Sequence, residues 1–344
     1  MYRFESDYLE GCLPEILKKL QDTNFEQTSG YGRDPHCERA RSLIRIACEA
    51  PDADVHFLVG GTQTNATVIS HILKPFQGVL STDTGHINVH ETGAIEKGGH
   101  KVLAIPGKDG KMDAHSLECV IESHFADPGK EHTVQPGMVY LSFPTELGTL
   151  YTLKELTQIS KICTKWDIPL FIDGARLGYG LVSPSSDVTL PDIARLADVF
   201  YIGGTKQGAL FGEAVVFKDK KLSDNFRYTI KQNGGMLAKG RLIGLQFEVL
   251  LENGLYFKAA RHAVSQAILL KEAFRNKGFD FLTDSSTNQQ FPILPNEAIE
   301  QLSTDFSFDI WRPVDAGHTA VRVCTSWATT DDAISELVRK VQGL

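Results

Sequence analysis

Two reactive side chains follow apolar segments of this sequence. Asp173 comes directly after the run Leu170–Ile172, and Lys206 lies in the glycine-rich stretch 203–208 that follows Val199–Ile202. A lysine whose pKa is lowered by burial can form a Schiff base with a carbonyl group. A carboxylate can keep the ring nitrogen of an aromatic cofactor protonated. The separation of Asp173 and Lys206 suffices for one crossover unit of about 30 residues, so we expect both at one sheet edge.

A glycine-rich turn earlier in the chain could hold a phosphate group. The segment 60–65 follows the apolar run Val55–Val59 and begins a helical pattern. Glycines such as Gly61 allow close approach to the backbone, free amides and the helix dipole favour an anion, and Thr62 adds a hydroxyl donor. The lysine of a Walker motif is missing, and a plain glycine turn with a threonine cap would read the same way.

Two further residues support a cofactor site, each with a structural alternative. His86 follows the next apolar run and would place an imidazole over the same crevice, although a lone histidine is more often structural. Arg176 follows Asp173 by three residues, so this pair could also be a helix cap with a salt bridge. The order of phosphate turn, acid and lysine along the chain nevertheless matches the order that such a cofactor site requires.

The periodicity of residues 41–240 predicts a large α/β domain with a mostly parallel, doubly wound sheet. Ligands of such sheets bind beyond the carboxyl ends of the strands, which is where these reactive residues lie. We expect strands at Val55–Val59, Gly78–Ser81, Val102–Ile105, Met138–Phe143, Leu170–Ile172, Val199–Ile202 and Ala214–Phe217. The crossover helices are predicted at Thr64–Leu73, Ala114–Ser123, Leu153–Trp166 and Asp192–Ala197.

Residues 241–344 are predicted to form two connecting helices and a small C-terminal α+β domain. Helical spacing runs from Leu242 to Asn276 with a break at Asn253-Gly254. Residues 1–40 are expected to form an N-terminal arm. The small domain should contain strands at Gln290–Leu294, Phe306–Trp311 and Ala320–Cys324, and a closing helix at Asp331–Gln342 capped by Thr330.

Composition and charge exclude several classes of partner. The 344 residues carry a formal net charge of -8, from 35 Lys+Arg and 43 Asp+Glu, without a long run of like charges. Nucleic acid and anionic membranes are therefore poor candidate partners. The first ten residues lack the pattern of a secretory signal, and no stretch approaches the length of a membrane span. We therefore expect a soluble, cytoplasmic protein.

Neither cysteines nor histidines form a recognisable metal site. The six cysteines include no close pair, so free thiols are expected. His86 and His90 have the i, i+4 spacing of helical metal ligands, with Asp83 nearby, but no third ligand pattern follows. We predict that no metal is bound.

Taken together, these motifs resemble those of the low-specificity L-threonine aldolase family. This family belongs to the beta-eliminating lyase group of fold type I enzymes, which share an aspartate aminotransferase-like fold and use pyridoxal 5'-phosphate (PLP). The resemblance covers nearly the whole chain. Its motifs correspond to Ser6-Asp7, Tyr31-Gly32-Arg33-Asp34-Pro35, Gly61-Thr62, His86, Asp173-Gly174-Ala175-Arg176 and Thr205-Lys206.

The resemblance implies roles for the matching residues. Lys206 would form the covalent link to PLP, Asp173 would pair with the ring nitrogen, and His86 would stack on the ring. The other residues implied in cofactor binding are Gly61, Thr62, Arg176, Thr205 and Lys231. The residues implied in binding the carboxylate of a small amino acid substrate are Arg322, Ser6 and Arg176. The resemblance also implies a homodimer or homotetramer with sites shared between subunits.

Two departures from the family pattern affect the expected substrate. Many of these aldolases carry a second active-site histidine in an Asn-Thr-His-Asn stretch, where this chain reads Ser142-Phe143-Pro144-Thr145-Glu146. The role of that histidine would fall to His86, Glu146 or a water molecule. The family's Met-Arg pair is also replaced, by Met236-Leu237. Substrate preference is the property most exposed to these changes.

Three functions are compatible with the sequence. The first is retro-aldol cleavage of a β-hydroxy-α-amino acid, such as threonine, allo-threonine or phenylserine, to glycine and an aldehyde. The second is β-elimination or transamination with the same cofactor, in which Lys206 would remove the α-proton. The third is a non-catalytic protein whose glycine turn binds a different phosphate or nucleotide.

Overall fold

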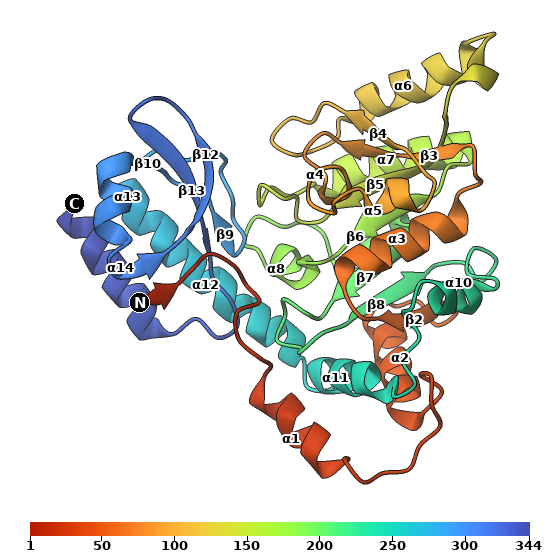
Figure 1. Ribbon diagram of the computed structural model, residues 1–344, viewed down its shortest axis with the longest axis horizontal. Coiled ribbons are helices and arrows are strands. Elements are labelled where there is room, and N and C mark those ends of the chain that lie inside the picture. The colour runs from red at the N-terminus through yellow and green to blue at the C-terminus, as the bar shows by residue number, and fades with distance from the viewer.

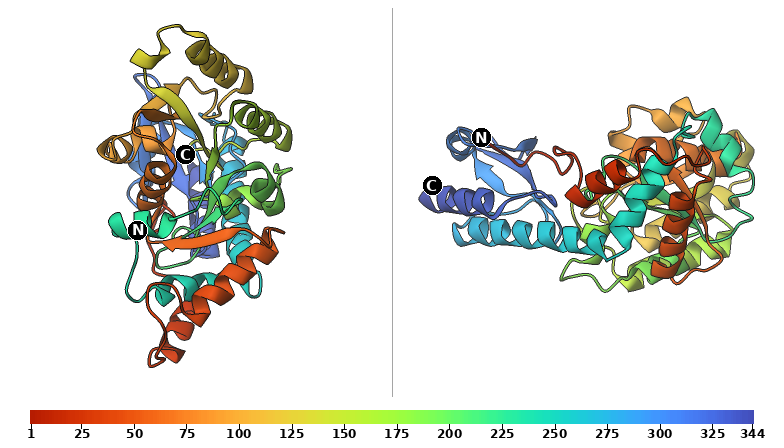
Figure 2. Two further views of the ribbon diagram at one scale, coloured as in Figure 1. Left: turned by 90° about the vertical axis from the view of Figure 1, so that its right-hand side faces the viewer. Right: turned by 90° about the horizontal axis from the view of Figure 1, so that it is seen from below.

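The computed structural model describes all 344 residues and shows two lobes joined by a long helix (Figures 1 and 2). The larger lobe contains a seven-stranded sheet of order β2-β8-β7-β6-β5-β3-β4. Only β8 runs antiparallel to its neighbours, so the predicted, mostly parallel sheet is confirmed. The strands are β2 (Asp54–Leu58), β3 (Gln77–Thr82), β4 (Val102–Ile105), β5 (Gln135–Ser142), β6 (Leu170–Asp173), β7 (Val199–Gly203) and β8 (Glu213–Phe217).

Helices cover both faces of this sheet, as a doubly wound fold requires (Figure 1). One face packs against α3 (Gly61–Ile72), α4 (His86–Val89), α5 (Ala94–Lys97) and α10 (Phe226–Gln232). The other face packs against α2 (Pro35–Ala47), α6 (Ala114–Ala126), α7 (Leu153–Trp166), α9 (Leu190–Leu196) and α11 (Arg241–Leu251). Two smaller helices, η1 (Lys130–His132) and α8 (Leu177–Leu181), complete the lobe. All four predicted crossover helices are present.

Local sequence signals explain why some helices were predictable. The helix α7 begins at a capping box in which Thr152 and Glu155 satisfy each other's backbone amides, and it ends at Asp167 in the left-handed conformation. Thr189 and Asp192 form the same motif at the start of α9. Both boxes lie directly before an apolar run of helical period. The crossover helices are therefore specified locally as well as by burial.

The smaller lobe follows α11 and the 22-residue helix α12 (Leu255–Asn276), with Gly254 at the break in the left-handed conformation (φ 63°). Its antiparallel sheet has the order β10-β13-β12, with β9 also paired to β13. The two-stranded sheet of β1 (Tyr2–Arg3) and β11 (Phe306–Ser307) runs parallel. The other elements are β9 (Gln289–Gln290), β10 (Ile293–Pro295), α13 (Asn296–Leu302), β12 (Asp309–Pro313), β13 (His318–Cys324) and α14 (Asp331–Gly343).

Two predicted strands of the small lobe are each divided in the structure. Gln290–Leu294 separates into β9 and β10, because Phe291-Pro292 interrupts the pairing and proline has no amide to donate. Phe306–Trp311 separates into β11 and β12, because the first part pairs with β1 and the second with β13. The predicted closing helix is correct, and Thr330 accepts a hydrogen bond from the Ala333 amide as its N-cap.

The N-terminal segment contacts both lobes. Its β1 belongs to the small lobe, whereas α1 (Pro14–Asp22) lies against α11 (Figure 1). The helix α2 runs across the predicted boundary at residue 41, and its N-cap Asp34 accepts a hydrogen bond from the Cys37 amide through its side chain. The domain boundaries at residues 41 and 241 stay predictions. None of the helices has both the length and the apolar character needed to cross a membrane.

Close packing of α2 on α11 depends on Gly244. A Cβ atom at this position would lie 2.6 Å from the Cα atom and 2.9 Å from the amide nitrogen of Cys37. Alanine normally stabilises a helix interior relative to glycine by about 1 kcal/mol, but here it would press against backbone that cannot move freely. We predict that Gly244→Ala lowers the free energy of unfolding by about 1–3 kcal/mol in a urea titration.

Gly343→Ala is the matched control, because nothing lies within 4 Å of a Cβ atom built at that helical glycine. This control should leave the free energy of unfolding unchanged or slightly raised. A stabilising Gly244→Ala would show that Cys37 of α2 does not lie as close to Gly244 as these contacts require.

Candidate active site

A cleft of about 300 Å³ lies at the carboxyl edge of the large sheet. Seven of the ten predicted site residues line it: Gly61, Thr62, His86, Asp173, Arg176, Thr205 and Lys206. Ser6, Lys231 and Arg322 do not. The cleft is also lined by residues that were not predicted as site residues, among them Tyr8, Glu91, Tyr201, Phe211 and Glu213. The strand ends therefore converge as the sequence indicated.

Asp173 ends β6 and is buried among four hydrogen-bond donors. Its Oδ1 accepts from the Tyr201 hydroxyl (2.5 Å) and the Ala175 amide (2.9 Å), and its Oδ2 accepts from the Tyr140 hydroxyl (2.5 Å) and Asn65 Nδ2 (3.0 Å). Burial raises the pKa of the Asp173 carboxyl. The charge of nearby His86 and the tyrosine hydrogen bonds outweigh burial, so this pKa lies below its usual value. The carboxylate is therefore held ionised at the floor of the cleft.

His86 begins the short helix α4 and is oriented by a buried glutamate. Its Nδ1 lies 2.7 Å from Glu91 Oε1, and the Glu91 side chain is fully buried. Asn65 Nδ2 donates to the same Glu91 oxygen (2.7 Å) as well as to Asp173. A single amide therefore couples the orientation of His86 to that of Asp173.

The amine of Lys206 has no hydrogen-bond or ion-pair partner in the protein and lies 5.9 Å from the ring centroid of Tyr8. Burial lowers the pKa of Lys206, and the charge of Arg176 lowers it further, against the opposing effect of Asp7 and Asp173. The backbone carbonyl of Lys206 accepts a hydrogen bond from Tyr179 Oη (2.5 Å). The backbone is thus anchored while the amine stays available as a nucleophile.

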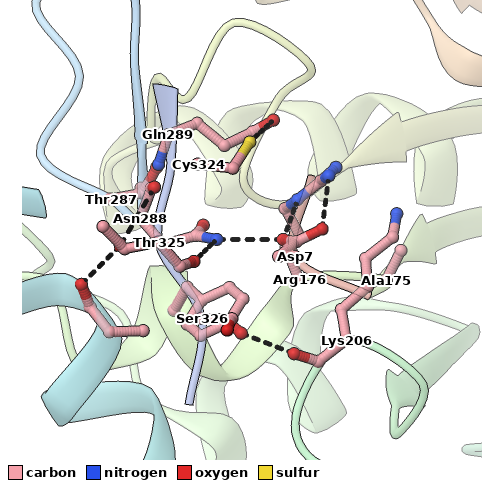
Figure 3. A network of polar contacts seen from close by, with 12 residues as sticks. Asp7, Ala175, Arg176, Lys206, Thr287, Asn288, Gln289, Cys324, Thr325 and Ser326 are labelled. Atoms are coloured by element: carbon pink, nitrogen blue, oxygen red, sulfur yellow. Dashed lines mark hydrogen bonds and ion pairs between the residues drawn. The ribbon is translucent and has the colours of Figure 1, made fainter. Parts of the chain in front are cut away.

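Arg176 is held by a buried carboxylate from the N-terminal segment (Figure 3). Its Nε and Nη2 donate to the two oxygens of Asp7 at 2.7 and 2.9 Å. Asn288 Nδ2 also donates to Asp7 (2.9 Å), and to the Thr325 carbonyl (2.9 Å). Burial raises the pKa of Asp7, but the charges of Arg176 and Lys206 outweigh it and lower that pKa. Most of the guanidinium fork is therefore committed to Asp7 within this chain.

The expected phosphate-binding turn keeps its amides free. The helix α3 begins at Gly61, and its N-cap Gly60 provides no side-chain cap. Thr62 is exposed at this end and lines the cleft. Uncapped amides at a helix N-terminus form a site for an anion. Across the cleft, the Thr205 hydroxyl donates to Glu213 Oε1 (2.8 Å), so Thr205 is already bonded.

Glu213 is a buried acid beside this turn. Its two oxygens accept from the Thr205 hydroxyl and from the Gly204 amide (3.1 Å). Burial raises the pKa of Glu213 to about 8, although these hydrogen bonds and the charge of Lys206 act in the opposite direction. A protonated Glu213 would remove a negative charge from the side of the cleft where a phosphate is expected.

The donor set of the cleft fits PLP. An unpartnered, half-buried lysine amine suits an aldehyde group, and an ionised carboxylate suits a protonated ring nitrogen. Uncapped helix amides suit a phosphate. These three features lie on one cleft, so the residues present match the three functional parts of that cofactor.

Arg322 lies on β13, outside the cleft. Its Nη2 forms an ion pair with Asp309 Oδ2 (2.8 Å) and donates to the Glu5 carbonyl (3.2 Å). Its guanidinium lies 5.3 Å from the ring centroid of Trp311, which in turn lies 6.3 Å from the ring of His90. Its Nε is buried without a partner. A substrate carboxylate would have to compete with Asp309 for this arginine.

Ser6 and Lys231 also do not line the cleft. Ser6 is buried next to Asp7, and its hydroxyl has no hydrogen-bond partner. Lys231 lies over the Tyr31 ring, 4.9 Å from its centroid, in a separate hollow that also includes Arg33 and Arg227. Within one chain, Lys231 therefore does not join the other predicted cofactor-binding residues.

Sequence reasoning missed the residues that hold the reactive groups. Tyr140 and Tyr201 lie within buried strands, where a tyrosine reads as core packing. Glu91 and Glu213 follow no strand end in sequence, although Glu213 begins the antiparallel strand β8 and so reaches the same edge. Asp7 was noted only as part of a motif. The one sequence signal for these residues is the charged Glu213 at the start of an apolar run, which is typical of a functional residue at a strand end.

Comparison with known proteins places these observations in a family. The model of the Beta-eliminating lyase family matches residues 4–296. A low-specificity L-threonine aldolase of Pseudomonas sp. (strain NCIMB 10558) is 28% identical over 346 aligned residues, covering 99% of this chain and 97% of the relative.

Two solved structures show the same fold. Leishmania major threonine aldolase superposes with a TM-score of 0.97 and 44% identity, covering 100% of this chain and 99% of the other. Thermus thermophilus aspartate aminotransferase superposes with a TM-score of 0.70 at 13% identity, covering 99% of this chain and 96% of the other, which shows the fold alone. The predicted aspartate aminotransferase-like fold is confirmed.

The raised pKa of Glu213 predicts a pH-dependent stability. Between the ordinary glutamate pKa and about 8, the unfolded chain releases this proton while the folded protein keeps it, so stability falls as pH rises. Glu213→Gln removes this loss, because the neutral amide can still bond Thr205 and Gly204. We predict that the free energy of unfolding of Glu213→Gln, relative to wild type, increases from pH 5 to pH 8. The slope should approach at most about 1.4 kcal/mol per pH unit.

Urea unfolding at four pH values measures this difference. Glu131→Gln serves as control, because Glu131 is exposed and should give no such slope. A pH-independent difference between Glu213→Gln and wild type would mean that Glu213 is ionised in the folded protein throughout this range.

Proposed function

We propose a function for this chain from the premise that it belongs to the Beta-eliminating lyase family. It is a PLP-dependent lyase that cleaves threonine or a related β-hydroxy-α-amino acid to glycine and an aldehyde. The similarity to threonine aldolases over the full chain supports this activity. The observation that carries it is the convergence of an unpartnered Lys206 amine and an ionised Asp173 carboxylate on one cleft.

We assign the cofactor to the residues whose chemistry matches it. Lys206 would hold PLP covalently, and Asp173 would pair with its ring nitrogen. The amides at the start of α3, with Thr62 and Thr205, would hold its phosphate, and His86 would lie against its ring. The chemistry that PLP would supply when bound is an electron sink for the pair left on the α-carbon as the Cα–Cβ bond breaks.

The side chains around these residues would support the reaction. Tyr140, Tyr201 and Asn65 keep Asp173 ionised, which keeps the ring nitrogen of the bound cofactor protonated. The hydrogen bond from the Tyr179 hydroxyl to the Lys206 carbonyl restrains the backbone of Lys206. The free amine can therefore return to the same position after each turnover. Burial of these groups strengthens each electrostatic interaction relative to water. Arg322 would bind the carboxylate of the substrate and so orient the substrate in the cleft.

The second part of this proposal concerns the oligomeric state of the enzyme, the role of Lys231 and the cellular location. We infer a homodimer or homotetramer in which a neighbouring subunit shares the site, which would give the distant Lys231 a role there. Action in the cytoplasm also stays a prediction. Size-exclusion chromatography with light scattering would measure the assembly.

Product analysis tests the proposed activity. The purified enzyme with PLP should release glycine and an aldehyde from threonine, allo-threonine or phenylserine, whereas β-elimination of serine would give pyruvate and transamination would give a new amino acid. Lys206→Ala should abolish turnover and the borohydride-reducible link to the chain, because the amine that attacks the cofactor is lost. Lys165→Ala, which removes a surface lysine paired with Glu118, should behave as wild type.

Two results would contradict this assignment. Pyruvate from serine without glycine from threonine would favour the elimination reaction. A tryptic peptide carrying reduced PLP on another lysine would remove Lys206 from the reaction.

The assignment of Arg322 to the substrate carboxylate makes a kinetic prediction. Arg322→Lys keeps the charge but loses the planar fork that pairs with a carboxylate. We expect kcat/KM for threonine to fall roughly tenfold to a hundredfold, mostly through KM, because substrate and transition state both carry that carboxylate. The affinity for PLP should be unchanged. Arg312→Lys is the matched control, since Arg312 lies on the neighbouring strand β12, is exposed and forms no ion pair.

An unchanged kcat/KM in Arg322→Lys, or a loss confined to cofactor occupancy, would leave Arg322 as the structural partner of Asp309 alone. Titration of the apoenzyme with PLP separates the second outcome from a defect in substrate binding.

A further inference from the structure

The loop after β5 brings a glutamate to the wall of the cleft beside His86. Glu146 Oε1 accepts hydrogen bonds from the His86 amide (2.8 Å) and from the Ser142 hydroxyl (2.5 Å). These two bonds join the end of β5 to the start of α4. They hold the carboxylate in one orientation against the cleft, which Ser142, Thr145 and His86 also line.

The second oxygen of Glu146 remains open. Glu146 Oε2 makes no hydrogen bond within the protein, and it is not among the enclosed polar atoms that lack a partner. Glu146 is half-buried and lines the cleft. One oxygen therefore anchors the side chain, while the other is left to meet a ligand.

The other carboxylates that line the cleft are engaged on both sides or enclosed. Asp173 already accepts four hydrogen bonds. Glu91 is fully buried and bonded to His86 and Asn65. Glu213 accepts from Thr205 and from the Gly204 amide, one bond on each oxygen. Glu146 is the carboxylate of the cleft that combines an anchored oxygen with an open one.

We propose that Glu146 is the catalytic base that takes the proton from the β-hydroxyl group of the substrate. This inference rests on the proposed function, because only cleavage of a β-hydroxy amino acid requires that proton to leave. Burial and the charge of Asp173 support the role by raising the pKa of Glu146, against hydrogen bonds from Ser142 and its own backbone, which makes the carboxylate a stronger base.

The step balances without another reactant. The β-hydroxyl proton passes to Glu146 Oε2, and the O–H bonding pair becomes the second bond of the aldehyde carbonyl. The Cα–Cβ pair stays with the α-carbon, which later gains one proton to give glycine. Glu146 returns its proton to solvent or to the product, so one proton is removed and one is added per turnover.

Two variants at this position test the proposal against a purely structural role. Glu146→Gln keeps an oxygen for the His86 amide but removes the basic group. We expect it to lower kcat for threonine cleavage by about 100-fold or more, the usual contribution of a positioned base. Glu146→His introduces another base at the same place and should recover kcat to within about tenfold of wild type.

Two readouts independent of cleavage separate chemistry from structure. The affinity of the apoenzyme for PLP, from an absorbance titration, should stay within about twofold of wild type in both variants. Exchange of the α-proton of glycine with deuterated solvent, followed by NMR, involves no β-hydroxyl and should stay within about threefold. Loss of kcat with both readouts preserved supports Glu146 as the base.

Three results would overturn the proposal. Cleavage by Glu146→Gln within about threefold of wild type would place the base elsewhere, while the proposed function would stand. Loss of PLP affinity and glycine exchange in both variants would make Glu146 a structural residue. A wild-type enzyme that exchanges the α-proton of glycine but cleaves no β-hydroxy amino acid would overturn the proposed function, and this inference with it.

Discussion

A carboxylate carried into the interior at the end of β6 must be met by donors on every side, because an unpaired buried charge costs several kcal/mol. Asp173 meets this requirement with hydroxyls from the two flanking strands, Tyr140 on β5 and Tyr201 on β7, and with Asn65 on the helix above them. A slip of one residue in either strand would turn its tyrosine to the opposite face of the sheet. The register of three strands and the position of α3 are therefore tied to one charge.

A second buried charge joins the two lobes. Arg176 lies three residues after Asp173, the last residue of β6, and pairs with Asp7 of the N-terminal segment. Asn288 of the small lobe donates a hydrogen bond to the same Asp7. Each donor in these contacts between the lobes is matched by an acceptor. Moving one lobe relative to the other would therefore leave a buried charge without its partner. Arg176, which lines the cleft, is consequently held in place by residues that lie far from it in the sequence.

Much of the large lobe could be predicted, because its strands are short apolar runs and each crossover helix has its own periodicity or cap. The convergence of Asp173, Lys206 and Gly61 followed from strand direction alone. The partners of these residues could not be predicted in this way. Whether the Tyr140 side chain packs in the core or donates a hydrogen bond depends on the strand beside it, and Glu213 reaches the edge of the sheet only because β8 is antiparallel.

The small-lobe strands were predicted as continuous in error, because their pairing with β1 and β13 is non-local. The position of Arg322 beside Asp309 depends on the same pairing.

The small lobe is assembled from the two ends of the chain (Figure 2). Phe4 is buried in the same core as Leu337 and Val341 of α14, whereas the strands of the large sheet are contiguous from residue 54 to residue 217. On a ribosome, the large sheet can pair while the last hundred or so residues are still being made, but Phe4 must wait for α14. Closing so long a loop is slow compared with local pairing. The lobe that carries Arg322 is therefore the last to become ordered, so the hydrogen-bond network of Arg176, Asp7 and Asn288 is completed only after the strands of the large sheet have been made.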